Sequence, residues 1–421
     1  MTIAASNVVL PQVTRRHVVA AVAGNALEFY DFTAYTFFAI QIGHAFFPSK
    51  SEFVSLMLSL GTFGAGFIGR PVGAIVIGAL ADRRGRRPAM VLSFALMGVG
   101  ILALALTPAF ATIGIAAPLI VIATRLVQGF ALGGQVGSAT AYLFEAAKPE
   151  TRGVYATLQY ASQGLAALLG GSVGLVLANV MSADDLGAFG WRIAFLLGAA
   201  VLPFGFVLQR NLPETLHAPE AAPGEGLREH LRVIVLGLFA LGSSTIAVYT
   251  LYYLPTYAQS VLHMRAGIAS ASGMVFGACN LIFALLSGWL SDRLGRKPVT
   301  IWPRVALSLI VVPLFLWLGA HPDGAALLTV SAVVAALATL SSGANLVAIA
   351  ESLPAHLRSG VLGTVYAFAI AGFGGSAQVI EAGLVHATGS ALAPAWYLTG
   401  ATAVGVVAML LMPETAPVKQ R

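Results

Sequence analysis

Two charged segments of this chain are near copies of each other and begin 210 residues apart. The first runs from Gly78 to Pro88 (GALADRRGRRP), and the second runs from Gly288 to Pro298 (GWLSDRLGRKP). Each follows a long apolar stretch and combines small residues, an acid, a basic cluster and a proline. A charged segment that recurs between apolar stretches indicates two homologous halves embedded in a membrane.

Two further pairs of matching segments occur in the same order along the chain. They are the stretches Glu145 to Arg152 with Glu351 to Arg358, and Pro213-Glu214-Thr215 with Pro413-Glu414-Thr415. Three matches in one order indicate an internal duplication. We therefore expect an N-terminal half over residues 1–210, a cytoplasmic linker over residues 211–232 and a C-terminal half over residues 233–421.

The composition is typical of a membrane protein. Of the 421 residues, 58% are hydrophobic and only 10% are charged, whereas soluble proteins carry roughly 25% charged residues. A helix needs about 20 apolar residues to span a bilayer. The sequence therefore predicts an all-α membrane protein with twelve transmembrane helices in two six-helix bundles, near residues 18–43, 53–80, 89–107, 115–143, 155–181, 192–210, 233–259, 266–290, 299–319, 325–349, 361–387 and 394–412.

Basic residues gather on one side of these expected spans. Of the 23 Lys and Arg residues, 18 lie in the termini and in alternate loops, in groups at positions 15–16, 83–87, 148–152, 210–232, 293–304, 358 and 419–421. Loops rich in basic residues remain in the cytoplasm, so we expect both termini there and the protein in the inner (plasma) membrane. The net charge of +6 then reflects topology and does not indicate nucleic-acid binding. No cleavable signal peptide is expected, and the single cysteine, Cys279, provides neither a disulfide nor a metal site.

Four charged residues lie well inside expected spans: Glu28, Asp31, Arg70 and Arg125. A charge at the bilayer centre costs at least about 2.5–3.5 kcal/mol, so each needs a compensating role. Counting from the helix ends at 1.5 Å per residue places Glu28, Arg70 and Arg125 near one level, and Asn25 shares a helical face with the two acids. The charges either neutralise one another or serve a ligand.

An arginine stays protonated and offers a fork of donors that matches a carboxylate. A carboxyl group near the bilayer centre can bind and release a proton as its hydration changes. We therefore expect Arg70 and Arg125 to bind substrate carboxylates, and Glu28 or Asp31 to carry a coupling proton.

The second half is expected to contribute polar but uncharged groups. Asn280 occupies the position that corresponds to Arg70, and no counterpart of Glu28 is present. Tyr249 and Tyr253 share a helical face, as do Gln159 and Gln163 in the first half, and all four are candidate substrate ligands. Glu381 and His386, toward the end of their helix, are interpreted as interfacial residues. We recognise no metal-ligand spacing and no catalytic arrangement, so no enzyme activity is expected.

The repeated charged segment, together with Arg125-x-x-Gln128-Gly129, resembles signatures of the major facilitator superfamily. The segments Gly24-Asn25-Ala-Leu-Glu28-Phe-Tyr-Asp31-Phe32 and Gly69-Arg70-Pro71-Val-Gly73 are similar to those of the metabolite:proton symporter family. The stretch from Ser51 to Gly78 and the segment Tyr252-Tyr253-Leu-Pro255-Thr256 most resemble its citrate and tricarballylate branch. The resemblance covers nearly the whole chain. It adds Gln128 to the candidate substrate ligands and implies that the repeated segments latch the two halves in one access state through Asp82, Arg83, Arg86, Asp292, Arg293 and Arg296.

These observations predict a secondary transporter that carries a small organic acid, such as a citrate-like di- or tricarboxylate, into the cell together with protons. Alternatives are another carboxylate or a zwitterion (2-oxoglutarate, shikimate, proline or betaine), an efflux antiporter, and a non-transporting membrane sensor. The proton gradient replaces any cofactor. The expected partners are the carboxylate, protons and the lipid bilayer, with no nucleic acid, and the protein is expected to be a monomer.

Overall fold

The computed structural model describes residues 15–84, 86–145, 147, 151–210, 230–353 and 355–420. The expected linker falls mostly in residues 211–229, outside these ranges. Within the ranges every regular element is a helix, in the order α1 (Arg15–Phe37), α2 (Ala39–Phe46), α3 (Glu52–Gly66), α4 (Gly69–Arg84), α5 (Arg86–Leu106), α6 (Phe110–Ile113), α7 (Ala116–Glu145), α8 (Arg152–Val180), α9 (Ala183–Asp185), η2 (Leu186–Gly190), α10 (Trp191–Arg210), α11 (Leu231–Ser260), α12 (Ala266–Leu294), α13 (Arg296–Ala320), α14 (Gly324–Glu351), α15 (Ala355–Ala369), η4 (Ile370–Gly374), α16 (Gly375–Thr388), α17 (Ala393–Leu411) and α18 (Pro417–Gln420).

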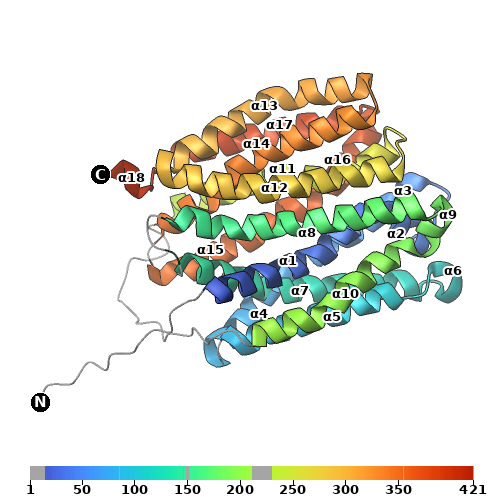
Figure 1. The fold of residues 1–421 in the computed structure, drawn as a ribbon, viewed down its shortest axis with the longest axis horizontal. Helices are drawn as coiled ribbons and strands as arrows, with labels where there is room; N and C mark the ends of the chain where they lie inside the picture. The colour runs from blue at the N-terminus through green and yellow to red at the C-terminus, as the bar shows by residue number, and fades with distance from the viewer. Residues whose placement is uncertain are drawn as a thin grey trace, which may run out of the picture.

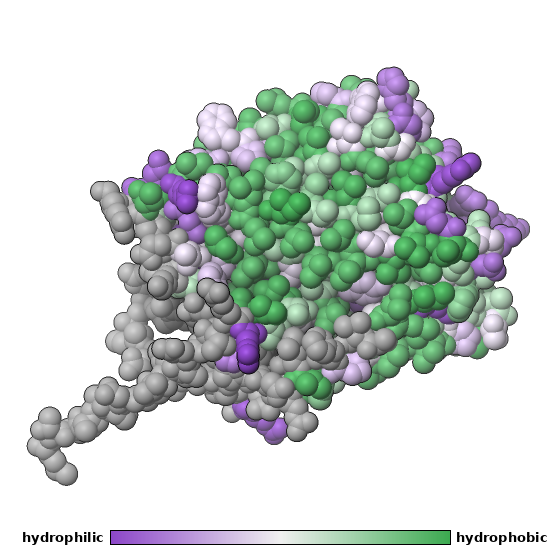
Figure 2. Space-filling view, in the orientation of Figure 1, coloured by the Kyte–Doolittle hydropathy of each residue, from purple (hydrophilic) through white to green (hydrophobic). Residues whose placement is uncertain are grey.

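The expected all-α membrane fold is confirmed. Each of the twelve predicted spans corresponds to one long helix or to consecutive helices, such as α3 with α4 or α15 with η4 and α16. In the described part of the chain, nine helical stretches are both long and apolar enough to cross a membrane. Figure 2 shows a broad apolar belt around the middle of the molecule and hydrophilic residues near its two ends, as expected of a surface that faces lipid.

The long helices run side by side, and the beginning of α1 lies at the same end of the bundle as α18 (Figure 1). We call this the terminus end and the opposite one the far end. Helices α8 and α12 lie together along their length. A Cβ at Gly277 of α12 would collide with the backbone nitrogen of Leu168 of α8, so only glycine permits this separation. Small residues allow membrane helices to approach in this way.

The second predicted span is interrupted between α3 and α4, and this break positions a key side chain. Phe67 and Ile68 form the turn, and α4 resumes at Gly69. Pro71 follows in the first turn of α4, where its missing N–H is tolerated because no partner in the preceding turn is needed. Arg70 therefore begins a new helix beside the aromatic ring of Phe67, with its Cζ 4.2 Å from the ring centroid.

Candidate functional site

Arg125 and Asp31 form a buried ion pair between α7 and α1. Arg125 Nη1 lies 2.9 Å from Asp31 Oδ2, and Nη2 lies 3.4 Å from Oδ1. Both side chains are 0% exposed. The Arg125 fork is thus occupied by the protein itself, which supports the interpretation that the inner charges neutralise one another at this position. Removing one partner of such a pair costs about 3–5 kcal/mol because the other charge is left buried alone.

Arg70 is also buried, at 2% exposure, but its surroundings differ. Among the described residues no carboxylate forms an ion pair with it, and its Nε and Nη2 have no hydrogen-bond partner. The guanidinium lies against the rings of Phe67 and Phe32, at 4.2 and 4.9 Å from Cζ to the centroids, and beside the Tyr249 hydroxyl. Arg125 also approaches Phe32, at 5.8 Å, so the two arginines flank one aromatic ring.

The polar face of α1 joins α8. Asn25 donates to Ser162 Oγ at 2.6 Å and accepts from Gln159 Nε2 at 3.2 Å. Glu28 follows on the same face and is 1% exposed. Gln128, at 0% exposure, lies beside Asp31. The structure therefore brings the expected ligands Asn25, Gln128 and Gln159 and the expected proton carriers Glu28 and Asp31 into the protein interior.

A small cavity of about 20 Å³ lies between the two sets of helices. It is lined by Phe29, Tyr160, Gln163, Ser244, Thr245, Val248, Tyr249, Tyr252, Tyr366 and Ile370. We call this the central cavity. A space of this size holds roughly one water molecule, so a citrate-sized ligand enters only after the surrounding helices separate. Of the expected ligands, Gln163 and Tyr249 line it, and Tyr252 and Tyr366 join them.

Two expected ligands lie elsewhere. Asn280 donates to the Tyr160 carbonyl at 3.4 Å and accepts from Thr339 at 3.0 Å, so its side chain ties α12 to α8 and α14. Tyr253 is turned away from the central cavity and lines a pocket nearer the far end. Although Tyr249 and Tyr253 share a helical face, their rings therefore belong to different spaces.

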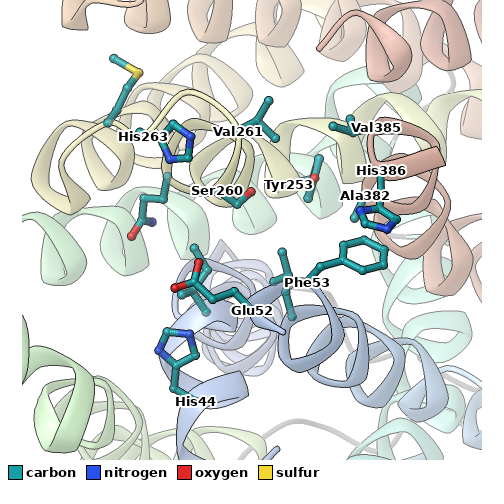
Figure 3. A pocket seen from close by; sticks show the side chains of 14 residues that line it. His44, Glu52, Phe53, Tyr253, Ser260, Val261, His263, Ala382, Val385 and His386 are labelled. Carbon is teal, nitrogen blue, oxygen red and sulfur yellow. The ribbon is translucent and has the colours of Figure 1, made fainter. Parts of the chain in front are cut away.

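The pocket nearer the far end has a volume of about 620 Å³. Figure 3 shows His44 and Glu52 approaching from the first half, opposite Tyr253, Ser260 and His263 of the second. The His386 ring stacks on Phe53, with centroids 3.7 Å apart, and this contact connects α16 to α3. We call this space the far-end pocket. It contains more room than the central cavity, which makes it a candidate entry route.

Glu381 is fully buried, contrary to its interpretation as an interfacial residue. Its side chain on α16 is 0% exposed, and the Thr250 hydroxyl of α11 donates to its Oε1. His386, one and a half turns further along the same helix, is exposed as expected. The difference arises because α16 packs its Glu381 face against α11, which helix periodicity alone did not identify.

Arg304 is a buried residue that the sequence analysis missed. It was counted with the basic loop residues 293–304, but the structure places it inside α13 at 2% exposure. The second half is thus not free of buried positive charge. The sequence does indicate that Arg304 lies in a membrane helix, because position 304 falls within the expected span of residues 299–319.

At the terminus end, Asp292 connects α12 to the beginning of α8. Its carboxylate accepts from the backbone N–H groups of Gly153 at 2.9 Å and Val154 at 3.2 Å. A carboxylate at a helix N-terminus satisfies unpaired donors and interacts favourably with the helix dipole. Arg296 Nη1 holds the same carboxylate at 2.7 Å. This cluster, which we call the latch, joins the two halves of the chain.

The latch extends to the other two duplicated segments. Arg296 Nη2 lies 2.9 Å from Glu351 Oε1, and Thr415 donates to Glu351 at 2.8 Å. Glu414 accepts from the backbone N–H groups of Arg296 and Lys297, each at 2.9 Å. Burial alone would raise the pKa of Glu414, but these backbone donors together lower it below its ordinary value.

Of the remaining expected gating residues, Arg293 has a side chain that the structure describes. Arg293 is exposed and lies over the Trp289 ring, with Cζ 4.1 Å from the centroid. Asp82, Arg83 and Arg86 are on α4 and α5, but their side chains lie outside what the structure describes. The latch is therefore defined here for the second copy of the duplicated segment.

The fold is a bundle of membrane-length helices, and acids and arginines are buried inside it. This is the architecture of a polytopic transporter. The chain belongs to the Major Facilitator Superfamily, whose sequence model matches residues 21–378. This confirms the resemblance, and the chain is a transporter and not an enzyme.

Relatives of known name cover almost the whole chain. It is 36% identical to a citrate-proton symporter of Salmonella typhi, over 93% of this chain and 92% of that one. It is 34% identical to a citrate-proton symporter of Klebsiella pneumoniae (92% and 89%) and 33% identical to an alpha-ketoglutarate permease of Escherichia coli (98% and 97%). A D-xylose-proton symporter structure has the same fold, with a TM-score of 0.76, 19% identity and coverage of 96% and 98%.

Proposed function

We propose that this protein carries a di- or tricarboxylate of the citrate type into the cell together with protons. The observation that carries the proposal is the buried Arg70, which has no carboxylate partner among the described residues and lies beside Tyr249 of the central cavity. A guanidinium in that setting is a binding site for an anionic group. The similarity to symporters of citrate and alpha-ketoglutarate favours a substrate with several carboxylates.

The proposed movement is a rocking of residues 1–210 against residues 233–421, with residues 211–232 as the tether. The basic residues at the terminus end favour a cytoplasmic location for both termini. With the latch engaged at that end and the far-end pocket open, the described arrangement resembles a state that receives substrate from outside. Alternating access about a central site then moves substrate and proton inward.

We assign the coupling proton to Glu28, with Asp31 as the alternative carrier. Glu28 is almost fully buried, and a buried carboxyl group can bind a proton while its surroundings are dry and release it when they become hydrated. If Asp31 is the carrier instead, its protonation weakens its hold on Arg125 and releases that fork for the substrate. A fixed substrate site and a titratable acid in one interior space are what proton coupling requires.

The substrate class is tested by thermal unfolding of the purified protein in detergent. A ligand that binds only the folded state stabilises it by RT ln(1 + [L]/Kd), about 2.7 kcal/mol at one hundred times Kd. We expect citrate, tricarballylate or 2-oxoglutarate to raise Tm, and shikimate, proline and betaine to leave it unchanged. A response restricted to proline or betaine would favour the zwitterion alternative, since relatives named proline/betaine transporters are 27% identical.

Counterflow of labelled substrate in proteoliposomes provides the second measurement. A symporter or antiporter exchanges labelled for unlabelled substrate, whereas a membrane sensor exchanges none. Dependence of net accumulation on an inward proton gradient then separates uptake from efflux, because an antiporter is driven in the opposite direction.

Substitution of Asp292 by asparagine is expected to weaken the latch and slow uptake. Asparagine still offers an oxygen to Gly153 and Val154 but loses the charge that the helix N-terminus and Arg296 favour. A loss of about 1–2 kcal/mol would shift the access equilibrium roughly 5- to 30-fold. Initial uptake rates into proteoliposomes, at matched reconstitution, measure the effect.

A matched control is Asp323→Asn, which also alters a carboxylate that caps a helix. Asp323 accepts from the Ala326 N–H at 2.8 Å within α14 and joins no other helix. The Asp323→Asn variant should have a slightly lower Tm than the wild type and the same uptake rate. Equal uptake by the wild type and the Asp292 variant would show that this contact does not control access.

A further inference from the structure

Arg304 of α13 has a charged guanidinium in the interior of the second half. It is 2% exposed. Nη1 donates to the Ala240 carbonyl at 3.3 Å, and Nη2 donates to the Ser244 hydroxyl. Both acceptors are uncharged groups of α11. Among the described residues, no carboxylate forms an ion pair with Arg304.

The other buried arginines show how the chain normally compensates such a charge. Arg125 has Asp31, and Arg296 has Asp292 and Glu351. A buried ion without a counter-charge costs several kcal/mol, and a guanidinium does not escape that cost by losing its proton. Among the described buried arginines, Arg70 and Arg304 are the two that form no ion pair with a carboxylate. Both are therefore suited to a counter-ion that the chain does not supply.

The acceptors near Arg304 are also shared with another donor. Asn345 Nδ2 donates to the same Ala240 carbonyl at 2.9 Å and to the same Ser244 hydroxyl at 3.1 Å. The guanidinium has five N–H donors, so two contested neutral acceptors satisfy it poorly. The Ser243 hydroxyl, close by, is buried and has no hydrogen-bond partner among the described residues. A carboxylate would satisfy both groups.

Gly405 of α17 packs directly against Nη1. A Cβ at this position would lie 2.5 Å from Arg304 Nη1 and would also collide with the Ser243 hydroxyl oxygen. Any larger residue would therefore displace the guanidinium or the hydroxyl. The absence of a side chain at position 405 keeps these two donors next to each other.

The location connects Arg304 to the proposed transport site. Ser244, which Arg304 contacts, lines the central cavity, and so does Tyr160, whose hydroxyl lies within electrostatic range of the guanidinium. Arg70 lies beside Tyr249, which also lines the cavity. Ser244 and Tyr249 are five residues apart on α11, a rise of about 7.5 Å. One arginine of each half thus contacts a residue that lines the central cavity.

We propose that Arg304 binds one carboxylate of the substrate while Arg70 binds another. This inference rests on the proposed function and deepens it, since it selects substrates with at least two carboxylates and favours those with three. The ligand replaces the Ser244 hydroxyl on the guanidinium and draws α11 and α13 toward it. Binding by both halves at once gives the substrate a direct influence on their separation.

The test measures binding of two ligands to the purified wild type and to Arg304→Gln by calorimetry. Tricarballylate has three carboxylates, whereas pentanoate has the same five-carbon chain with only one. Loss of a charged hydrogen-bonding partner, worth about 1.5–3 kcal/mol, should weaken tricarballylate roughly 10- to 100-fold. Pentanoate, whose single carboxylate can bind at Arg70, should lose much less affinity. Arg232→Gln, an exposed arginine of the same half, should change neither affinity.

Gly405→Ala is a second variant, which keeps an arginine at position 304, and it covers the case in which Arg304→Gln does not fold. It should also weaken tricarballylate more than pentanoate, because its methyl group would displace the Arg304 guanidinium. Equal affinities in the wild type and a folded Arg304 variant, or an equal loss for both ligands, would overturn the inference while leaving carboxylate binding intact. If the wild type binds neither ligand nor citrate, the proposed function fails, and the inference fails with it.

Discussion

Replacing Glu28 with glutamine is expected to abolish proton-driven accumulation of substrate while exchange of substrate across the membrane continues. Glutamine resembles the protonated acid in shape but cannot release a proton. The variant therefore binds substrate and exchanges it in counterflow, and the gradient no longer contributes free energy to accumulation. The measurement compares uptake under an inward proton gradient with counterflow at equal pH on the two sides.

Two variants sharpen this result. Glu52→Gln changes an exposed acid that lines the far-end pocket and should retain proton-driven accumulation. If the Glu28 variant also accumulates substrate fully, Glu28 is not the proton carrier, and Asp31→Asn becomes the deciding variant. Loss of both accumulation and counterflow in the Glu28 variant, at normal Tm, would instead indicate a role in substrate binding.

Replacing Arg70 with glutamine is expected to remove substrate binding without destabilising the protein. No ion pair joins this guanidinium to a carboxylate among the described residues, so its removal eliminates a buried charge without breaking such a pair. Tm without ligand should stay equal or rise, whereas affinity for a tricarboxylate should fall roughly 10- to 100-fold. Thermal unfolding with and without ligand gives both quantities.

Arg125→Gln is the matched comparison, because it removes a buried arginine that does have a partner. Asp31 would be left buried and unpaired, at a cost of about 3–5 kcal/mol. We expect a clear fall in Tm for this variant before any ligand is added. Similar changes in Tm for the two arginine variants would mean that Arg70 also neutralises a charge within the protein, and would remove the main support for its role as a ligand.

Much of this architecture is visible in the sequence. Long apolar stretches predict membrane helices because a bilayer leaves no other partner for backbone groups. The duplicated segments predicted two halves, and the family resemblance implied a latch between them; Asp292 of the second segment lies at the N-terminus of α8. Counting residues along helices placed Glu28, Arg70 and Arg125 well inside their spans, and all three side chains are buried.

The sequence did not reveal which charges pair. Asp31 and Glu28 are both within reach of either arginine on a helical projection, and only the packing of α1 against α7 assigns Asp31 to Arg125. Likewise, Tyr253 and Asn280 were reasonable ligands by residue type. The structure places Tyr253 in the far-end pocket. The side-chain nitrogen and oxygen of Asn280 both form hydrogen bonds to other helices.

The sequence by itself determined the class of fold, the repeated frame and the presence of buried charge, because each depends on local composition or spacing. Position 304 lies within an expected span, but the tertiary structure was needed to show that Arg304 turns into the protein and contacts a residue in the wall of the central cavity. The physical reason is that a basic residue near a helix end can extend into water or turn inward. Its direction depends on neighbours from α11 and α17, such as Ser244 and Gly405, which are distant along the chain.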